Sequence, residues 1–352
     1  MSSTLPPSPT VFDPSVHRDA IEQAAQRLAQ GLLVAFPTET VYGLGARADD
    51  DEAVARIFKA KGRPSDHPLI VHVCDATEAL AFTDDIPLVA QRLMARYWPG
   101  PLTVIVPRRA GMGQAAAGGQ NTIGLRCPDH PVALALLNEA ARLGVPGVAA
   151  PSANRFGRIS PTRAEHVVDE FASEDLWVLD GGPCEVGIES AIVDCSRAHP
   201  VLLRPGLLTR DELEIVAGQA MAFSRPEAPD PKAPRASGTL LAHYAPRARL
   251  RLMDEALLLR ALDDLVAVLV GWSPVNPPKV AVYSRSAWAH RPVQPGVLMR
   301  VMPAQAPLAA HELFAALRDM DAHGVEQIWV ESPPLDPAWD GVRDRLARAA
   351  AA

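Results

Sequence analysis

The sequence lacks several features that mark common protein classes. It has four cysteines in 352 residues, and none of them forms a Cys-x-x-Cys pair. The absence of such pairs excludes zinc ribbons and thioredoxin-type redox motifs. The small number of cysteines is typical of proteins in a reducing compartment. Neither the Gly-x-x-x-x-Gly-Lys-Ser/Thr phosphate loop nor the Gly-x-Gly-x-x-Gly dinucleotide motif occurs. Any phosphate binding must therefore come from side chains that the fold brings together.

The chain also lacks an excess of basic residues and long apolar runs. Its net charge of -7 argues against bulk electrostatic binding to nucleic acid, although it leaves room for a local basic patch. The most apolar long window, residues 256–272, contains Arg260, Asp263 and Asp264, which is typical of a core helix rather than a membrane span. Residues 1–14 are polar and proline-rich, without the apolar stretch of a signal peptide. We expect a cytoplasmic protein that makes no contact with a membrane.

Length and composition predict two domains. A chain of 352 residues is too long for one typical core, and its 48% hydrophobic content is enough for two. Composition changes over residues 223–238, where prolines accumulate and apolar residues thin out. We therefore predict a first domain over residues 14–218, a proline-rich linker over 219–247 and a smaller second domain over 248–352.

Strand-like and helix-like segments alternate in both domains, which predicts the α/β class. Several connections in the first domain are too short for a crossover helix, so its sheet should be mixed, whereas regular alternation in the second domain favours parallel pairing. The main strands predicted are residues 32–36, 69–73, 102–106, 122–126, 147–150, 176–179, 191–194, 201–203, 249–253, 279–283, 297–302 and 327–331. The main helices predicted are residues 15–30, 50–60, 88–97, 131–143, 162–171, 254–268, 307–322 and 340–349.

Residues 36–45 (Phe-Pro-Thr-Glu-Thr-Val-Tyr-Gly-Leu-Gly) are the most informative stretch. A strand stops at a proline and opens into a turn rich in hydroxyl groups, where Gly43 and Gly45 are expected to allow unusual backbone conformations or a close approach of ligand. Lys59, Lys61 and Arg63 follow as a cluster of cations. Hydroxyl donors beside fixed cations are typical of a nucleoside triphosphate site. Turn chemistry for the threonines, and a solvated helix end for the cations, remain the alternatives.

Other polar residues at strand ends are ambiguous when taken singly. Arg126, between apolar neighbours on a predicted strand, needs an anionic partner, which could be an internal carboxylate or that of a substrate. His72 alternates with apolar residues, as buried core histidines commonly do. Ser152 and Asn154 could form a turn or cap a helix, and Arg204 could pair with a nearby carboxylate. The residues alone indicate either an anion-binding α/β enzyme or a nucleic-acid binder.

Taken together, these segments resemble the YrdC-like domain. The motifs that carry the resemblance lie at residues 36–45, 59–64 (Lys-Ala-Lys-Gly-Arg-Pro), 68–72, 98–103 (Trp-Pro-Gly-Pro-Leu-Thr), 124–128, 150–154 (Ala-Pro-Ser-Ala-Asn) and 188–190. With His-Tyr-Ala-Pro at 243–246 and a second α/β unit, the chain resembles the two-domain form of the L-threonylcarbamoyladenylate synthase family. This implies a twisted, open mixed sheet with a concave, positively lined cavity, followed by a smaller, Rossmann-like parallel domain.

The resemblance also implies a reaction, in which L-threonine, bicarbonate or CO2, and ATP with Mg2+ give threonylcarbamoyl-AMP and pyrophosphate. A downstream tRNA threonylcarbamoyltransferase complex would use the product next to the anticodon, and a weak contact with tRNA is implied too. Threonine would be held by Thr40, His72, Arg126 and Ser190, with the backbone of Ala150 nearby. Lys61 and Arg63 would be the catalytic cations, and Mg2+ would be held through the ATP phosphates rather than by protein ligands. The residues implied for ATP are Arg63, His67, Thr122, Ser152, Ser160, Arg204 and Tyr244.

Two features set this chain apart from the usual family pattern. His67 stands where asparagine is common, and the segment before Tyr244 is unusually proline-rich. An RNA-binding or translation-regulating module with a basic concave face is the main alternative function. The hydrogenase-maturation carbamoyltransferases contain a similar domain, but they also carry zinc-finger cysteine pairs that this chain lacks. An inactive regulatory homologue is disfavoured because Lys61, Arg63, Arg126 and Ser152 are all present.

Overall fold

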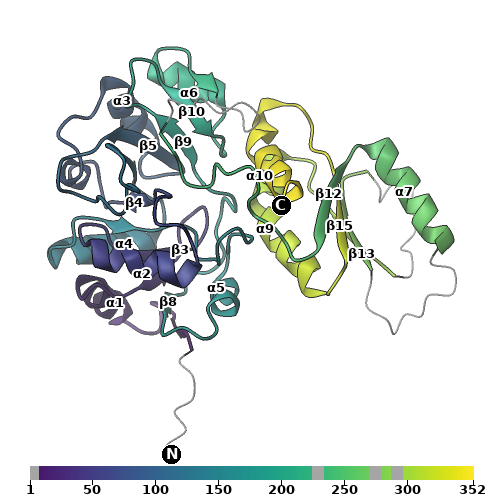
Figure 1. Ribbon diagram of the computed structural model, residues 1–352, viewed down its shortest axis with the longest axis horizontal. Coiled ribbons are helices and arrows are strands. Elements are labelled where there is room, and N and C mark those ends of the chain that lie inside the picture. The colour runs from purple at the N-terminus through teal and green to yellow at the C-terminus, as the bar shows by residue number, and fades with distance from the viewer. Residues whose placement is uncertain (1–7, 224–233, 269–278, 287–295) are drawn as a thin grey trace, which may run out of the picture. The chain divides into compact units, whose positions relative to one another are not determined.

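The computed structural model describes residues 8–223, 234–268, 279–286 and 296–352, and these form two compact units (Figure 1). The first contains Met1–Phe156 and Ser160–Leu240; the second contains Leu241–Ala352 together with the short segment Gly157–Ile159. The chain thus passes between units after residue 240, within the segment predicted as a linker. Residues 224–233 of that segment lie outside the described residues.

The first unit is built on a mixed sheet of eleven strands in the order β1-β8-β2-β3-β7-β4-β6-β5-β9-β10-β11. Both parallel and antiparallel pairs occur in it, which confirms the predicted mixed α/β fold. Its strands are β1 (Thr10–Phe12), β2 (Val34–Phe36), β3 (Gly43–Arg47), β4 (Ile70–His72), β5 (Leu102–Pro107), β6 (Thr122–Arg126), β7 (Val148–Ala149), β8 (Trp177–Leu179), β9 (Ala191–Asp194), β10 (Val201–Arg204) and β11 (Ala222–Phe223).

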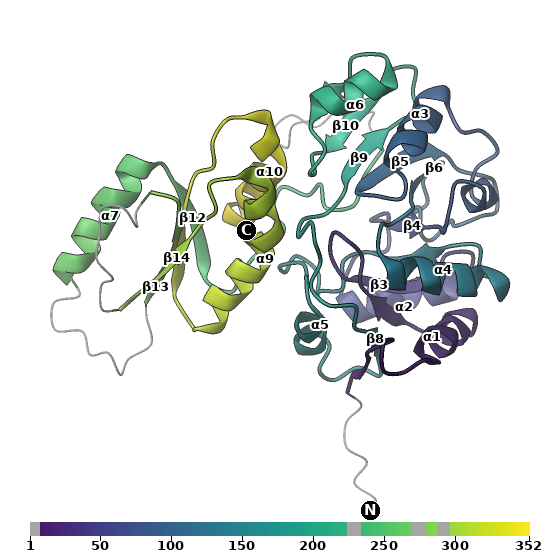
Figure 2. The same ribbon diagram turned by 180° about the vertical axis from the view of Figure 1, so that it is seen from behind.

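Two groups of helices pack against this sheet, and α1 lies against α4 as α3 lies against α6 (Figures 1 and 2). The helices of the first unit are α1 (Ala20–Ala29), α2 (Asp51–Lys61), α3 (Leu88–Tyr97), α4 (Pro131–Arg142), α5 (Ala164–Glu170) and α6 (Arg210–Ala217), with a short 3-10 turn, η1 (Glu78–Ala81). Because successive strand residues point to opposite faces, the core divides into two layers. Ala35 of β2 packs in the cluster that contains α2 and α3, while its neighbours Val34 and Phe36 pack with α1 and α4.

The same alternation leaves a distinctive face on β4, β6, β5 and β9. Val71, Leu125 and Val104 pack into the core on the side of α2 and α3. The intervening residues Ile70 and Ile105 form a separate apolar cluster on the opposite face, against which Ala236 packs. Three of the predicted site residues, His72, Thr122 and Arg126, lie on that opposite face.

The glycines of residues 36–45 have a different role from the one predicted. Gly43 and Gly45 lie inside β3, and neither has a positive φ. A Cβ atom at residue 45 would lie 2.8 Å from both Phe36 Cε1 and Val148 Cγ1. Gly45 is therefore required by close contact with neighbouring side chains, not by a turn conformation, and β3 was missed because its glycines were taken as turn residues.

Helix α2 brings the basic cluster to a fixed position because both of its ends are capped. The Asp50 side chain accepts hydrogen bonds from the backbone N–H groups of Glu52 and Ala53. At the other end Gly62 adopts the left-handed conformation, with φ of 64°, and closes the last turn. Lys61 is therefore the final residue of a well-defined helix.

The second unit contains a four-stranded parallel sheet in the order β12-β15-β13-β14, which confirms the predicted parallel α/β domain. Its elements are β12 (Arg249–Met253), α7 (Glu255–Val268), β13 (Val280–Ser284), β14 (Val297–Val301), α9 (Ala306–Ala322), β15 (Gln327–Glu331), the 3-10 turn η2 (Pro337–Trp339) and α10 (Asp340–Ala350). Among the described residues of the chain, no helix is both long enough and apolar enough to cross a bilayer.

Candidate active site

Three of the five residues predicted to bind threonine, His72, Arg126 and Ser190, lie in one row across the sheet of the first unit. His72 of β4 is in register with Arg126 of β6, so both side chains point to the same face. Val104 of β5 pairs with Leu125, which places Thr103 beside Arg126 on that face. Ser190 directly precedes β9, and its hydroxyl is hydrogen-bonded to the hydroxyl of Thr103, at 2.8 Å. Three adjacent strands, β4, β6 and β5, and the residue that precedes β9 thus contribute polar side chains to one line.

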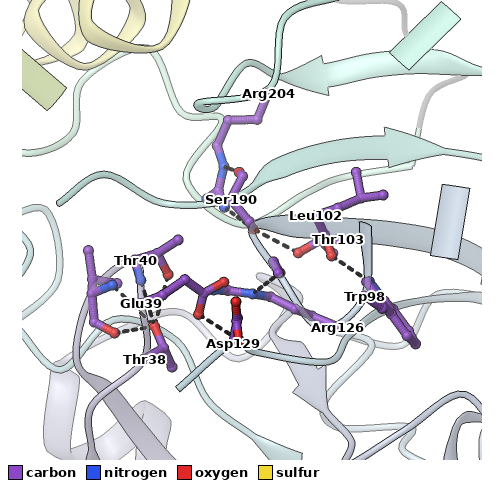
Figure 3. Close-up of polar contacts among 12 residues, drawn as sticks. Thr38, Glu39, Thr40, Trp98, Leu102, Thr103, Arg126, Asp129, Ser190 and Arg204 are labelled. Atoms are coloured by element: carbon purple, nitrogen blue, oxygen red, sulfur yellow. Dashed lines mark hydrogen bonds and ion pairs between the residues drawn. The ribbon is translucent and has the colours of Figure 1, made fainter. Parts of the chain in front are cut away.

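Arg126 has an internal carboxylate partner, Glu39, which is the first of the two alternatives that its sequence context left open (Figure 3). Arg126 Nη2 lies 2.7 Å from Glu39 Oε1, and the two side chains are only 4% and 5% exposed. The two groups are not aligned for a hydrogen bond, and neither atom makes one with another described residue. The guanidinium therefore keeps hydrogen-bonding capacity for a second anion.

The loop that carries Glu39 is held by its own hydroxyl groups. Thr38 Oγ1 donates to the carbonyl oxygen of Val41 at 2.7 Å and accepts from the N–H groups of Thr40 and Val41, at 3.2 Å each. It also lies 2.9 Å from Thr40 Oγ1. Glu39 Oε2 accepts from the backbone N–H of Asp129 at 3.1 Å. The Thr40 hydroxyl, predicted to bind threonine, therefore also takes part in turn chemistry.

Ser190 and Arg204 are coupled at the next position along the row (Figure 3). Arg204 donates through Nε to the Ser190 carbonyl at 3.1 Å and through Nη2 to the Ser190 hydroxyl at 3.3 Å. Its Nη1 donates to the carbonyl of Ser237 at 2.8 Å. Arg204, which was predicted to bind ATP, is thus in direct contact with Ser190, which was predicted to bind threonine.

His72 is neutral at physiological pH. Burial, helped by the positive charge of Arg126, lowers the pKa of His72 to about 3. Its Nδ1 is buried and has no hydrogen-bond partner among the described residues. A neutral imidazole nitrogen in this position can accept a hydrogen bond, but it is too weak a base to deprotonate an ammonium group.

Lys61 is turned into the protein rather than toward open space. Its ammonium group donates to the carbonyl oxygens of Ser152, at 2.6 Å, and Asn154. Burial, followed by the nearby charge of Arg63, lowers the pKa of Lys61 well below its usual value. Lys61 thus holds the loop that carries Ser152 in place, and its direct contact with a triphosphate stays a prediction.

Arg63 and His67 are grouped around Phe156. Arg63 donates to the carbonyl of Pro68 at 2.9 Å, and its guanidinium carbon lies 5.9 Å from the centre of the Phe156 ring. The centre of the His67 ring lies 5.6 Å from the same point. Burial, followed by the charge of Arg63, lowers the pKa of His67.

The remaining predicted residues of the first unit fall around this face. Thr122 opens β6 on the same side as Arg126, and the backbone N–H of Ala150 donates to the Ile70 carbonyl at 2.9 Å. Ser160 is fully buried and donates to Glu189 Oε1 at 2.5 Å. Glu189 is thus a second buried carboxylate at the site.

Residues 235–237, which we call the strap, cover a small cavity on this face. Arg235, Ala236 and Ser237 line it together with Thr122 and Thr103. Hydrogen bonds and an ion pair hold the strap to the rest of the first unit. The N–H of Arg235 donates to the side-chain oxygen of Gln120 at 2.8 Å, and Arg235 Nη1 pairs with Asp66, also at 2.8 Å. The carbonyl of Ser237 accepts from Arg204, as described above.

Tyr244 belongs to the second unit. Its ring centre lies 5.4 Å from that of Phe314 and 5.6 Å from the guanidinium carbon of Arg345. It is a non-glycine residue with a positive φ, of 64°. Its packing is thus explained within the second unit, and its role in binding ATP stays a prediction.

Glu39, Glu189 and Thr103 were not predicted as site residues. A signal for Glu39 was present, because a buried arginine requires an anion and Glu39 is the carboxylate inside the hydroxyl-rich loop. Glu189 and Thr103 carried no such signal, because their contacts join segments far apart in the chain. Within the described ranges, no group of three or more His, Cys, Asp or Glu side chains is arranged to hold a metal ion.

The chain is a mixed α/β protein whose sheet presents arginine, histidine and hydroxyl groups on one face, an arrangement suited to anions. Residues 26–206 match a family model described as "Telomere recombination", of the Sua5, YciO and YrdC proteins. Residues 208–351 match one described as "Threonylcarbamoyl-AMP synthase, C-terminal domain". The chain belongs to the threonylcarbamoyl-AMP synthase family in its two-domain form.

Individual relatives extend over nearly the whole chain. The threonylcarbamoyl-AMP synthase of Bacillus subtilis is 37% identical, covering 96% of this chain and 94% of its own length. That of Pyrococcus abyssi is 36% identical, covering 94% and 96%. The crystal structure of P. abyssi Sua5 complexed with L-threonine matches with a TM-score of 0.83 and 34% identity, covering 99% of this chain and 98% of that one.

Proposed function

We propose that the chain catalyses the formation of threonylcarbamoyl-AMP and pyrophosphate from L-threonine, bicarbonate or CO2, and ATP, as a nucleotidyltransferase. The observation that carries the proposal is Arg126, a buried arginine with spare hydrogen-bonding capacity in a row of hydroxyl groups. Such an arginine can bind the carboxylate of an amino acid in a bidentate manner. Family membership and the threonine complex of the P. abyssi relative support the same function.

The threonine site would centre on Arg126, with Thr40 and Ser190 as hydroxyl partners. The neutral His72 would accept a hydrogen bond from the threonine ammonium or hydroxyl group through Nδ1. The backbone of Ala150, which follows β7, would complete the wall. Glu39 would balance the charge of Arg126 in the absence of substrate.

The proposed reaction does not require a strong general base. The threonine amine adds to CO2, which arises from bicarbonate with loss of water, and the resulting carbamate loses a proton. A carbamate oxygen then attacks the α-phosphorus of ATP, and pyrophosphate leaves. Burial and the charge of Arg126 lower the pKa of His72, which makes this histidine a poor acceptor for the amine proton, and we assign catalysis to positioning and charge stabilisation.

The nucleotide site would adjoin the threonine site. Arg63 and Arg204 supply charge, and Lys61 acts by fixing the loop of Ser152. The remaining ATP contacts proposed are those of His67, Thr122, Ser160 and Tyr244. When bound with ATP, Mg2+ would be held through the ATP phosphates rather than by protein side chains, and it would offset their charge.

The product is a labile mixed anhydride, so a consumer must act on it promptly. We propose a tRNA threonylcarbamoyltransferase complex as that partner, together with a cytoplasmic location and at most weak direct contact with tRNA. The strap at residues 235–237 covers the cavity beside Thr122, and it would protect the adenylate from water.

The test is incubation of the chain with ATP, Mg2+, bicarbonate and labelled threonine. We expect pyrophosphate and a labelled adenylate to form only when both threonine and bicarbonate are present. Omission of each component in turn is the control. Pyrophosphate release that is independent of threonine would refute the proposal.

A further inference from the structure

A short segment of the chain between Phe156 and Ser160 is built into the second unit. The three residues Gly157–Ile159 cluster with residues 241–352, although their neighbours on both sides belong to the first unit. Arg158 forms a parallel bridge with Ala245, and the N–H of Ala245 donates to the Gly157 carbonyl at 2.8 Å. Segments far apart in the sequence are therefore paired here.

Two side chains of α9 fasten this pair of segments. Arg318 donates through Nη2 to the carbonyl oxygen of Ile159. Asp321, about one turn along, lies with Oδ2 3.5 Å from Arg158 Nη2. Its Oδ1 accepts from the N–H groups of Arg247 and Ala248, at 2.8 Å each. The Asp321 side chain is only 11% exposed, which strengthens these contacts relative to surface ion pairs.

The fastened segments end next to two residues assigned to ATP. Ser160 follows Ile159 directly, and Tyr244 precedes Ala245. Tyr244 also has a positive φ of 64°, a conformation that costs energy in a non-glycine residue and persists only where its surroundings impose it. The hydrogen bond of Ala245 to Gly157 and the contact of the Tyr244 ring with Phe314 are such surroundings.

We propose that Arg318 and Asp321 are positioning residues for ATP, which hold Ser160 and Tyr244 in their binding conformations by fastening residues 157–159 and 245–248 to α9. The inference rests on the proposed function, because the ATP roles of Ser160 and Tyr244 belong to it. Neither Arg318 nor Asp321 needs to touch the substrate.

The test compares Asp321→Ala and Arg318→Met with a matched control on the same helix, Asp319→Ala. Asp319 forms an ion pair with Arg300 at 2.7 Å, but its side chain is half exposed and fastens neither segment. We expect both test variants to raise the KM for ATP about fivefold to tenfold, as loss of one hydrogen-bonded contact would. The KM for threonine should change less than about twofold, and the control should match the wild type.

Conservative variants separate positioning from a general loss of structure. Asp321→Asn keeps an acceptor for the two backbone N–H groups, and Arg318→Lys keeps a donor for the Ile159 carbonyl, so each should recover most of the ATP affinity. A folded Asp321→Ala protein with an unchanged KM for ATP would overturn the inference. So would equal rises in the KM values for ATP and threonine. If Asp321→Ala does not fold, Arg318→Met and the two conservative variants decide in the same way.

A second readout does not depend on the reaction. Amide hydrogen exchange at Ala245, Arg247 and Ala248 should accelerate at least about tenfold in Asp321→Ala but not in Asp319→Ala. If the wild type makes no adenylate but this acceleration is seen, the proposed function is refuted, whereas the role of Asp321 in holding residues 245–248 is supported. Unchanged exchange rates at these amides would refute the fastening whatever the activity.

Discussion

Replacement of Arg126 by alanine removes the cation at the centre of the polar row and should abolish threonine-dependent pyrophosphate release. In the wild type this guanidinium is 2.7 Å from Glu39, and its side chain is only 4% exposed, so solvent screens its interactions weakly. A substrate carboxylate that replaces or joins Glu39 would meet the same low-dielectric surroundings. The variant offers that carboxylate no partner and leaves Glu39 without its counter-charge.

The expected magnitude follows from the burial of the pair. Loss of one member of a buried, charge-assisted contact costs about 2–5 kcal/mol in binding. At about 1.4 kcal/mol for each factor of ten, threonine affinity should fall by a factor between about 30 and several thousand. Arg142, which forms an exposed ion pair with Glu139, is the matched control, and Arg142→Ala should change stability by less than about 1 kcal/mol and leave threonine binding unchanged.

The assay is calorimetric titration of threonine into each variant, after circular dichroism and thermal unfolding have shown that the variant is folded. Glu39→Gln sharpens the result, because it leaves Arg126 in place without its anion. This variant should lose about 3–5 kcal/mol of stability, and threonine should restore more stability to it than to the wild type, since the substrate supplies the missing charge. Unchanged threonine affinity in folded Arg126→Ala would refute the assignment of Arg126 to the substrate carboxylate.

Three further predictions concern other parts of the structure. Lys61→Ala and Arg63→Ala should each lower the affinity for ATP by about tenfold or more, and they should lower the affinity for threonine less. If ATP titrations of both variants overlay that of the wild type, the cations are only a solvated helix end. Arg235→Ala, which loosens the strap over the cavity, should increase adenylate hydrolysis and proteolysis near residue 235 in the unliganded protein; identical cleavage rates with and without ATP and threonine would argue against a cover. Burial of Glu331 opposes its ionisation, but hydrogen bonds from Ser284 and Ser286 outweigh burial and lower the pKa of Glu331 from 4.5 to about 2. Glu331→Gln should therefore cost about 3 kcal/mol of stability at pH 7, and the difference should vanish as pH falls from about 4.5 to about 2, which urea unfolding at several pH values measures.

The local pattern of residues determined most of the elements. Five segments have the bounds that the sequence predicted: α3 (Leu88–Tyr97), β6 (Thr122–Arg126), β9 (Ala191–Asp194), β12 (Arg249–Met253) and β15 (Gln327–Glu331). These bounds follow from the spacing of apolar residues and from residues that end an element. Both can be recognised without knowing the fold.

Several elements were missed, among them strands whose sequence signal was weak or misleading. β3 (Gly43–Arg47) contains two glycines, which favour a turn when judged locally, but its neighbours Phe36 and Val148 leave no room for a side chain at residue 45. β1 and β11 are strands of three and two residues at the sheet edges, too short to show alternation. Pairing with a neighbouring strand, rather than local propensity, is what makes these segments strands.

The site divides in the same way. The sequence by itself determined which residue types were available: hydroxyl groups after β2, cations at the end of α2, and an arginine in β6 that required an anion. Only the tertiary structure decided that this anion includes Glu39, that Lys61 points to the Ser152 and Asn154 carbonyls, and that residues 157–159 are fastened to α9. The physical reason is that these contacts join residues far apart in the chain, so their geometry depends on strand order and register, which no local pattern encodes.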